Sequence, residues 1–439
     1  MYKLLMTLTA CLAAFVLQAQ NKIRYVEYDL PNGLHVILHE NHETPIVAVA
    51  VSYHVGSKNE NPNRTGFAHF FEHLLFEGSE NVKRGEFDKY IENAGGMNNA
   101  NTWYDRTFYY EVLPSNQLKL GLWLESERML HARVDSTGIE TQRQVVKEER
   151  RQRIDNQPYG SVIEETMKRL FKVHPYKWPV IGSMAHLDAA KEQDYVNFYK
   201  TFYVPNNAVL VVAGDIDIPT AKKEIEKYFA TIPRGIHPIP RPKPQEPPLR
   251  GVTVDTVYDN IQLPAVILGY RLPAQGTPDD YAVELLNTLL AGGQSSRLHK
   301  VLVDEKQKAL YVGSFPMALE DMGAGIMFAI ANMGVDPKEL TTEMDRVLDD
   351  VRNNLIPEKE FQKLLNQKES DFVQANNKMI GIAENLADYY MFYGNTDLIN
   401  TELDRYRKVT REDIRRVARK YYDPANRVIL YYLPKPKAQ

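Results

Sequence analysis

The sequence predicts an α+β fold assembled from two related halves, and three observations lead to this prediction. Apolar segments at residues 47–51 and 209–213 are typical of buried strands, while residues 217–229 repeat with a helical period. Strands and helices are interleaved without strict βαβ regularity, which favours α+β. In addition, landmarks recur at a fixed spacing on either side of a proline-rich segment.

The recurring landmarks share one offset. Residues 203–210 read Tyr-Val-Pro-Asn-Asn-Ala-Val-Leu and are echoed at residues 422–429, which begin 219 positions later (422 − 203). Residues 44–47 are echoed at residues 263–266 with the same offset (263 − 44). Two matched landmarks with one offset indicate an internal duplication.

A proline-dense segment, residues 232–248, lies between the two copies. Proline lacks a backbone donor and fixes φ, so this segment is predicted to be an extended linker. The predicted domains are therefore residues 21–231 and residues 249–439.

The N-terminus has the features of a secretory signal. Lys3 precedes an apolar run, residues 4–17, and small residues follow at a plausible cleavage region. We therefore predict a signal peptide over residues 1–20 and a periplasmic or secreted protein. A lipoprotein is the less favoured alternative, because the apolar run continues past Cys11 instead of ending there.

Composition excludes several classes of function. The chain has 439 residues, of which 44% are hydrophobic and 25% charged, which suits a globular protein of two or more domains. A net charge of −4 leaves no electrostatic footprint for nucleic acid. After the N-terminal run, no segment is long and apolar enough to span a bilayer.

Residues 69–73, His-Phe-Phe-Glu-His, are the most informative motif. On a helix, residues three or four apart are neighbours, so His69 and His73 can close on one metal ion with Glu72 beside them. Catalytic zinc sites typically use three protein ligands plus water, and we predict one zinc ion per chain. Alone, the motif fits equally well a helix with two histidines and a surface glutamate. Its apolar neighbours indicate burial, and buried imidazoles and carboxylates need partners.

A third ligand is expected on the helix predicted over residues 141–151, which carries Glu148 and Glu149. Adjacent helical positions diverge by about 100°, so only one of them should reach the metal. Through the run Val-Val-Lys-Glu-Glu, the chain resembles the pitrilysin/insulysin family of zinc peptidases, which includes the mitochondrial processing peptidases. The family's ligand spacing implies Glu149, since 75 residues separate it from His73 (149 − 73 − 1), and Glu148 is the rival. Gln142 stands where the family usually carries another glutamate.

The resemblance extends from about residue 27 to residue 434. Residues 95–102 resemble the family's glycine turn into an edge strand that pairs with the substrate backbone. This implies that Asn99 and Ala100 bind substrate, whereas without the family match the segment is an ordinary hairpin turn. Residues 174–176 and 181–182 resemble a further family landmark.

The second copy lacks the metal motif. When residues 73–78 (His-Leu-Leu-Phe-Glu-Gly) are aligned with residues 288–293 (Thr-Leu-Leu-Ala-Gly-Gly), residues 284–288 lie opposite the first motif and contain no histidine. Residues 292–298 resemble a family helix start, and Tyr311 matches a family tyrosine that contacts substrate. Asp304, however, stands where the family has an arginine. Some relatives pair a zinc-bearing subunit with a zinc-free homologue, so the resemblance implies a homodimer or such a heterodimer as the partnership.

The resemblance implies two homologous α/β-sandwich domains that face each other across a cleft and form a zinc-dependent endopeptidase. His69, His73 and Glu149 would hold zinc, and Glu72 would act as general base on peptides or unfolded segments. Two alternatives stay open. In the first alternative, the chain is a catalytic half that is inactive without a partner. In the second, it is a non-catalytic scaffold subunit.

Overall fold

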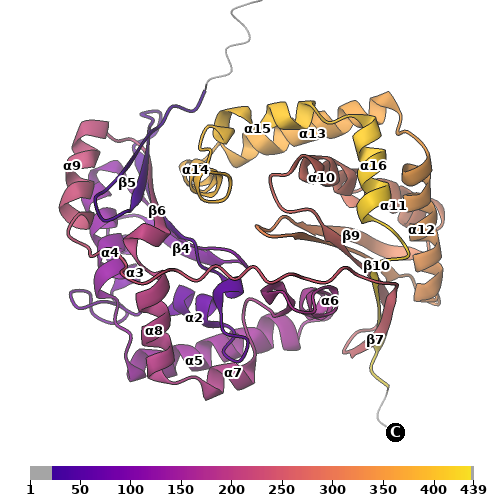
Figure 1. The fold of residues 1–439 in the computed structure, drawn as a ribbon, viewed down its shortest axis with the longest axis horizontal. Coiled ribbons are helices and arrows are strands. Elements are labelled where there is room, and N and C mark those ends of the chain that lie inside the picture. The colour runs from indigo at the N-terminus through magenta and orange to yellow at the C-terminus, as the bar shows by residue number, and fades with distance from the viewer. Residues whose placement is uncertain (1–21, 437–439) are drawn as a thin grey trace, which may run out of the picture.

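The computed structural model describes residues 22–436, in which two mixed β-sheets are each flanked by helices (Figure 1). The first sheet has the strand order β1-β2-β6-β3-β5-β4. β2 and β6 run parallel, and the other neighbouring pairs are antiparallel. The strands are β1 (Val26–Asp29), β2 (His35–Glu40), β3 (Ile46–Tyr53), β4 (Met97–Thr102), β5 (Thr107–Pro114) and β6 (Ala208–Gly214).

The second sheet repeats this arrangement with the order β7-β11-β8-β10-β9. β7 and β11 run parallel, as β2 and β6 do, and the remaining pairs are antiparallel. The two orders correspond strand for strand once β1 is set aside, which confirms the predicted α+β fold with two homologous domains. The strands are β7 (Thr253–Asp259), β8 (Ala265–Leu272), β9 (Ala309–Met317), β10 (Gly323–Ala331) and β11 (Val428–Pro434).

Helices of the first half bury apolar side chains against one face of the first sheet, with the exception of α6. They are α2 (Phe67–Leu74), α3 (Phe87–Asn93), α4 (Leu118–His131), α5 (Ser136–Arg150), α6 (Val162–Leu170), α7 (Met184–Ala189), α8 (Glu192–Phe202) and α9 (Ile218–Phe229). The helix predicted over residues 217–229 is α9, and Asp217 caps it by accepting a hydrogen bond from the Thr220 N–H.

Helices of the second half share a corresponding core with one face of the second sheet, with the exception of α14. They are α10 (Pro278–Ala291), α11 (Arg297–His299), α12 (Pro337–Asn353), α13 (Glu358–Ala375), α14 (Met379–Tyr393), α15 (Leu398–Arg407) and α16 (Arg411–Tyr421).

The remaining face of each sheet is covered by a helix from the other half. Helix α14 buries Leu386 in one core with Phe108 of the first sheet, and helix α6 buries Leu170 in one core with Ile267 of the second. At the 219-residue offset, residues 162–170 of α6 correspond to positions inside α14. The exchange is therefore reciprocal, and the apolar pattern of the sequence does not predict it.

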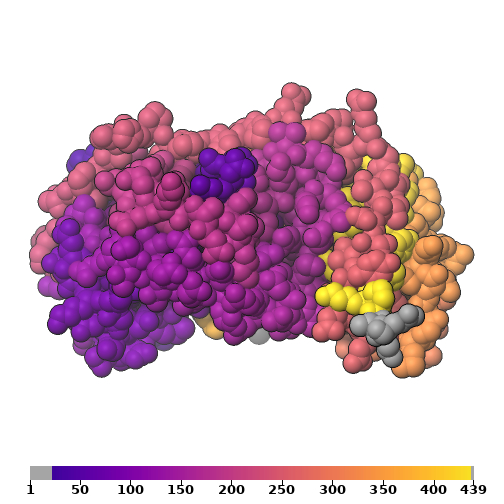
Figure 2. All heavy atoms as spheres, turned by 90° about the horizontal axis from the view of Figure 1, so that it is seen from below, coloured from indigo at the N-terminus to yellow at the C-terminus, as the bar shows by residue number. Residues whose placement is uncertain are grey.

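The segment between Phe229 and Thr253 contains no helix or strand and stretches from one domain to the other (Figure 1). Figure 2 shows it as a rose-coloured band along the upper edge of the molecule. Arg241 donates to the His54 carbonyl (2.6 Å), and Glu246 pairs with Arg271 of β8 (2.7 Å). The segment is thus fastened to both domains.

Lys58 lies at the centre of an ion cluster that joins the domains, although it is only 1% exposed. Its Nζ lies 2.9 Å from Asp105 of the first domain, 2.5 Å from Glu320 and 3.2 Å from Asp321 of the second. His174, from the landmark at residues 174–176, lies 3.2 Å from Asp321. We call Lys58, Asp105, Glu320 and Asp321 the interdomain ion cluster.

Within residues 22–436, no helix combines the length and the apolar character needed to cross a membrane. The predicted signal peptide, residues 1–20, and Cys11 lie outside the described residues.

Candidate metal centre

Helix α2 carries the histidine motif, and its N-terminus is held by a buried carboxylate. Glu60 is 6% exposed and accepts hydrogen bonds from the N–H groups of Gly66 (2.8 Å) and Ala68 (2.9 Å). The first N–H groups of a helix lack intrahelical partners, and this carboxyl group satisfies two of them. Burial raises the pKa of Glu60 to about 8.

Two glycines allow another segment to approach the start of α2 closely. Gly66 has a φ of +95°, and a Cβ on it would lie 2.7 Å from the Ile181 carbonyl oxygen. Gly182, in the landmark at residues 181–182, has a φ of +74° and lies against Gly66. Arg150, at the end of α5, donates to the Gly182 carbonyl (2.8 Å). The end of α5 is therefore tied to the start of α2.

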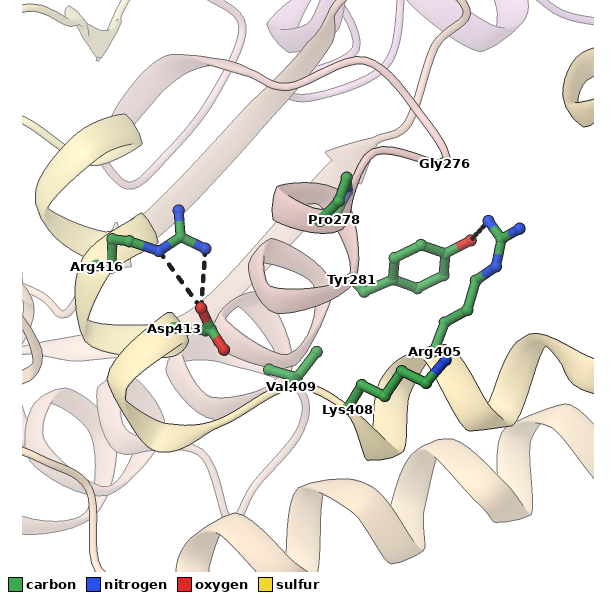
Figure 3. Close-up of a pocket in the computed structure, with 8 residues that line it drawn as sticks. All are labelled: Gly276, Pro278, Tyr281, Arg405, Lys408, Val409, Asp413 and Arg416. Atoms are coloured by element: carbon green, nitrogen blue, oxygen red, sulfur yellow. Dashed lines mark hydrogen bonds and ion pairs between the residues drawn. The ribbon is translucent and has the colours of Figure 1, made fainter.

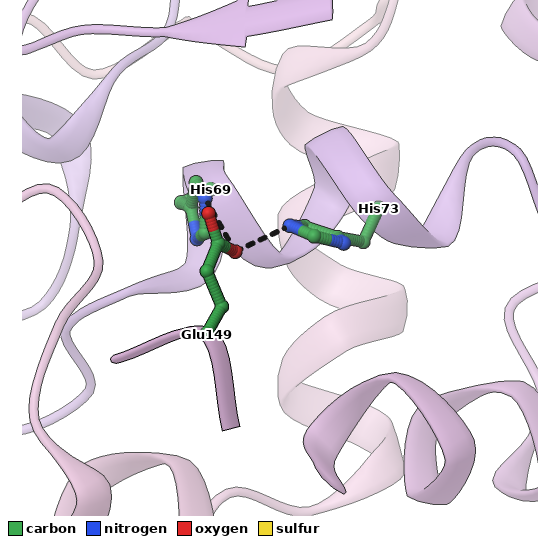
Figure 4. Close-up of side chains that lie close together, drawn as sticks. All are labelled: His69, His73 and Glu149. Carbon is green, nitrogen blue, oxygen red and sulfur yellow. Dashed lines mark ion pairs between the residues drawn. The ribbon is translucent and has the colours of Figure 1, made fainter. Parts of the chain in front are cut away.

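This packing brings together the three predicted ligands. Figure 4 shows the Glu149 carboxylate between the rings of His69 and His73. Its Oε2 lies 3.0 Å from His73 Nε2 and 3.5 Å from His69 Nε2. One nitrogen or oxygen from each residue lies within 4.8 Å of the others, which is a grouping able to hold a metal ion.

The protonation states of these groups suit a cation. Burial, reinforced by the neighbouring His73, lowers the pKa of His69 to about 4, so this imidazole is neutral near pH 7. Burial alone would raise the pKa of Glu149, but the contact with His73 and the charge of nearby Arg153 hold this pKa below its usual value. Metal ligands must be deprotonated, and the buried Glu149 Oε2 faces the Nε2 atoms of both imidazoles. The donor set of two imidazoles and a carboxylate fits zinc.

Glu72 lies one position before His73 on the same helix, and burial raises its pKa. The Thr102 hydroxyl, at the end of β4, acts in the opposite direction on this pKa. β4 is the edge of the first sheet and pairs only with β5 among the described strands. The predicted substrate-binding residues Asn99 and Ala100 lie on this edge strand, Asn99 exposed and Ala100 half-buried.

The remaining predicted site residue, Tyr311, lies on β9, the corresponding edge of the second sheet, and is 52% exposed. β4 and β9 both lie toward the middle of the molecule (Figure 1). Asp304 lies in the helical turn before β9, where its exposed carboxylate is 3.6 Å from His299.

The structure also shows the contacts of Glu148 and Gln142, the two other α5 positions considered in the sequence. Glu148 is exposed and pairs with Arg151 (2.9 Å), so the structure brings Glu149 and not its rival to the histidines. Gln142 donates to Glu77 (2.5 Å). A contact of Arg153 with the centre was not predicted, although a Glu–Arg pair four residues apart on a helix is a recognisable signal. The guanidinium of Arg153 lies 2.8 Å from Glu149 Oε1.

A hollow of about 280 Å³ on the second domain is unrelated to this centre (Figure 3). It lies among α10, α15 and α16, with Arg405, Lys408 and Arg416 in its lining. None of the predicted site residues lines it.

A duplicated α+β fold with one His-His-carboxylate group and an adjacent glutamate is typical of a metallopeptidase. Comparison with family models agrees with this class. Residues 35–183 match the insulinase family, peptidase family M16, and residues 190–368 match the inactive domain of M16 peptidases.

Individual relatives extend the match over nearly the whole chain. The zinc protease PqqE of Helicobacter pylori is 33% identical over 411 residues, which cover 92% of each chain. An uncharacterized zinc protease of Mycobacterium leprae is 30% identical over 68% of this chain and 67% of its own. The crystal structure of a protease from H. pylori superimposes with a TM-score of 0.89 at 30% identity, covering 94% of this chain and all of the other (100%). The chain belongs to peptidase family M16, which confirms the predicted family and the predicted class, a zinc protease.

Proposed function

We propose that the chain is a zinc endopeptidase in which His69, His73 and Glu149 hold one zinc ion and Glu72 is the general base. One observation carries this proposal. Ligand atoms from the three residues lie within 4.8 Å of one another, and Glu72 lies between the two histidines in the same helix.

When bound, zinc supplies an activated water and a polarised scissile carbonyl. The chain's own residues provide positioning and proton transfer. Glu72 accepts the proton of the attacking water and later donates it to the leaving amine. Its carboxylate is held near the ligands by helix α2, whose start Glu60 fixes.

Substrate is aligned as an extra strand on the free edge of β4, next to Asn99 and Ala100. Tyr311, exposed on the edge of the opposite sheet, contacts the same peptide from the second domain. An extended peptide suits this geometry, so peptides and unfolded segments are the substrates. The signal-like N-terminus supports a periplasmic or secreted location. The periplasmic protease PqqL of Escherichia coli shares the fold at a TM-score of 0.75 and 17% identity, covering 93% of this chain and 47% of that one.

The proposal is tested by elemental analysis combined with peptide cleavage. The purified chain is expected to retain about one zinc ion after dialysis and to cleave an unstructured peptide in a chelator-sensitive manner. His73→Ala should lose both the zinc and the cleavage. Stoichiometric zinc in that variant would refute the ligand assignment, and a zinc-loaded wild-type chain without cleavage would refute the activity.

A further inference from the structure

A cavity of about 540 Å³ lies between the two domains beside the end of β4. The first domain contributes Asn101, Thr102 and Trp103 at the end of this strand and in the following turn. The second domain contributes side chains of α10, α13, α14 and α15, including aromatic residues and most of the charged ones. None of the three proposed metal ligands lines the cavity, but Thr102 lies beside the proposed base Glu72.

The alternation of β4 shows which substrate side chains face this cavity. Ala100 is paired with Tyr109 and packs on the core that contains α2, whereas Asn101 is paired with Phe108, which packs on α14. Successive side chains of a strand point to opposite faces, and a peptide added to the β4 edge alternates in the same way. Every second side chain of such a peptide therefore points to the face on which α14 and the cavity lie.

The charged lining contains more carboxylates than cations. It consists of Asp105, Arg106, Glu284, Lys368, Asp388 and Glu402. Three of the four carboxylates have a cationic partner; the pairs are Lys58–Asp105 (2.9 Å), Lys368–Glu284 (2.7 Å) and Arg106–Asp388 (3.0 Å). Within the described chain, Glu402 has no cation at ion-pair distance.

Glu402 lies on α15 and accepts a hydrogen bond from the Tyr389 hydroxyl (2.5 Å). Burial raises its pKa. A cation entering the cavity would favour the charged form of this carboxylate.

The rest of the lining suits a long cationic side chain that enters with its backbone outside. Trp103, Tyr389 and Tyr393 provide aromatic surface, and aromatic faces attract ammonium and guanidinium groups. The cavity already contains one such contact, since Lys368 Nζ lies 4.5 Å from the centre of the Tyr406 ring. The buried Nε2 of Gln275 has no partner in the described chain and is a donor for a peptide carbonyl.

We propose that this cavity is a subsite for a lysine or arginine side chain of the peptide paired with β4, and that Glu402 is its charge partner. The inference rests on the proposed function, because it takes the β4 edge as the substrate strand.

The test measures peptide binding to the full chain carrying Glu72→Gln, so that cleavage does not consume the ligand. One lysine is moved along an otherwise neutral, acetylated and amidated peptide, and each peptide is compared with its norleucine counterpart by fluorescence anisotropy. At alternate positions, the lysine peptide is expected to bind about tenfold more tightly than its norleucine counterpart, because one favourable charge pair forms. A lysine-free peptide with a free N-terminus shows whether an α-amino group is the cation that the cavity takes.

Two substitutions on one helix separate the specific pairing from a general charge effect. Glu402→Gln should reduce the lysine preference to about twofold or less. Asp404→Asn removes the same charge two residues away, from an exposed carboxylate paired with Arg407 (3.0 Å), and should leave the preference intact. If Glu402→Gln does not fold, the alternation in the lysine scan still tests the subsite, because it needs no change at Glu402.

Equal affinity for lysine and norleucine at every position would overturn the inference, as would equal loss of the preference in the two α15 variants. Preference for the free N-terminus alone would assign the cavity to a peptide end instead of a side chain. Failure of the proposed function is seen separately. In that case the zinc-loaded wild-type chain cleaves none of these peptides, whereas cleavage without lysine preference refutes only the subsite.

Discussion

Helices α2 and α10 occupy equivalent places in the two domains, yet the partners of their polar side chains differ. On α10, Asn287 stands where α2 has Glu72, and it accepts a hydrogen bond from the Tyr422 hydroxyl (2.8 Å) while donating to the Val283 carbonyl (3.1 Å). On α2, by contrast, the Nε2 atoms of His69 and His73 face the Glu149 carboxylate, at 3.5 and 3.0 Å from its Oε2. Apart from these imidazoles, Glu149 Oε2 has no hydrogen-bond partner in the described chain.

The comparison teaches how a duplicated fold divides its roles. Buried polar groups without partners are costly, and a native structure keeps them where a ligand completes them. The second domain satisfies the polar side chain of its helix internally and gains stability, whereas the first directs the lone pairs of its ligand residues toward one point, where a metal can bind them. Four substitutions test this division, from the largest expected effect to the smallest.

Glu149→Gln should abolish zinc retention and, with it, cleavage, because a neutral amide replaces the one anionic ligand. Glu148→Gln is the matched control on the same helix. Its carboxylate is exposed and paired with Arg151, so zinc should stay near one ion per chain. Metal analysis after dialysis decides between them, and the reverse pattern would move the ligand by one residue.

Glu72→Gln should retain zinc but lower turnover by at least ~10²-fold, since the amide cannot accept the proton of the attacking water. The measurement is kcat on an unstructured peptide, with zinc content determined on the same sample. Wild-type turnover in this variant would mean that another group is the base.

Asp304→Arg should raise peptide turnover by roughly tenfold, because it restores a cationic donor in the second domain where Asp304 now places a carboxylate. The side chain is largely exposed, so the change should not disturb folding. A zinc-free homologous subunit with an intact arginine and tyrosine should raise the activity of the unmodified chain in the same assay. Full activity of a verified monomer, unaffected by either addition, would show that the second domain works without the arginine and without a partner.

Asn287→Ala should cost ~1–3 kcal/mol of stability, because it leaves the Tyr422 hydroxyl without its buried acceptor. Turnover per folded molecule should stay near the wild-type value, since this helix takes no part in the chemistry. Denaturant unfolding and zinc-normalised turnover give the two numbers. A large loss of turnover with unchanged stability would contradict the division of roles.

The duplicated fold was predictable because its signals are local. Short continuous apolar runs identified β3 and β6, and two landmarks with one offset identified the repeat. The exchange of α6 and α14 was not predictable in the same way, because an amphipathic pattern does not indicate which surface the helix packs against. One signal was present, since residues 379–393 carry apolar side chains on most faces, as a helix packed on several sides does.

In the candidate site, too, local sequence predicts some residues and not others. His69, Glu72 and His73 follow from five consecutive residues, whereas Glu149 needed a count along the chain that only the family resemblance supplied. Glu60 could not be found from sequence, because a carboxylate seven residues before a helix start has no fixed relation to the N–H groups of that helix. The cavity beside β4 was not predictable either, since its lining residues come from both domains.

The helix exchange also bears on how the chain folds. One face of the first sheet stays open until α14 has emerged, and about 165 residues separate the end of β6 from the start of α14 (379 − 214). Until α14 packs on it, the growing chain presents an apolar sheet face to its surroundings, and such a surface is prone to aggregate.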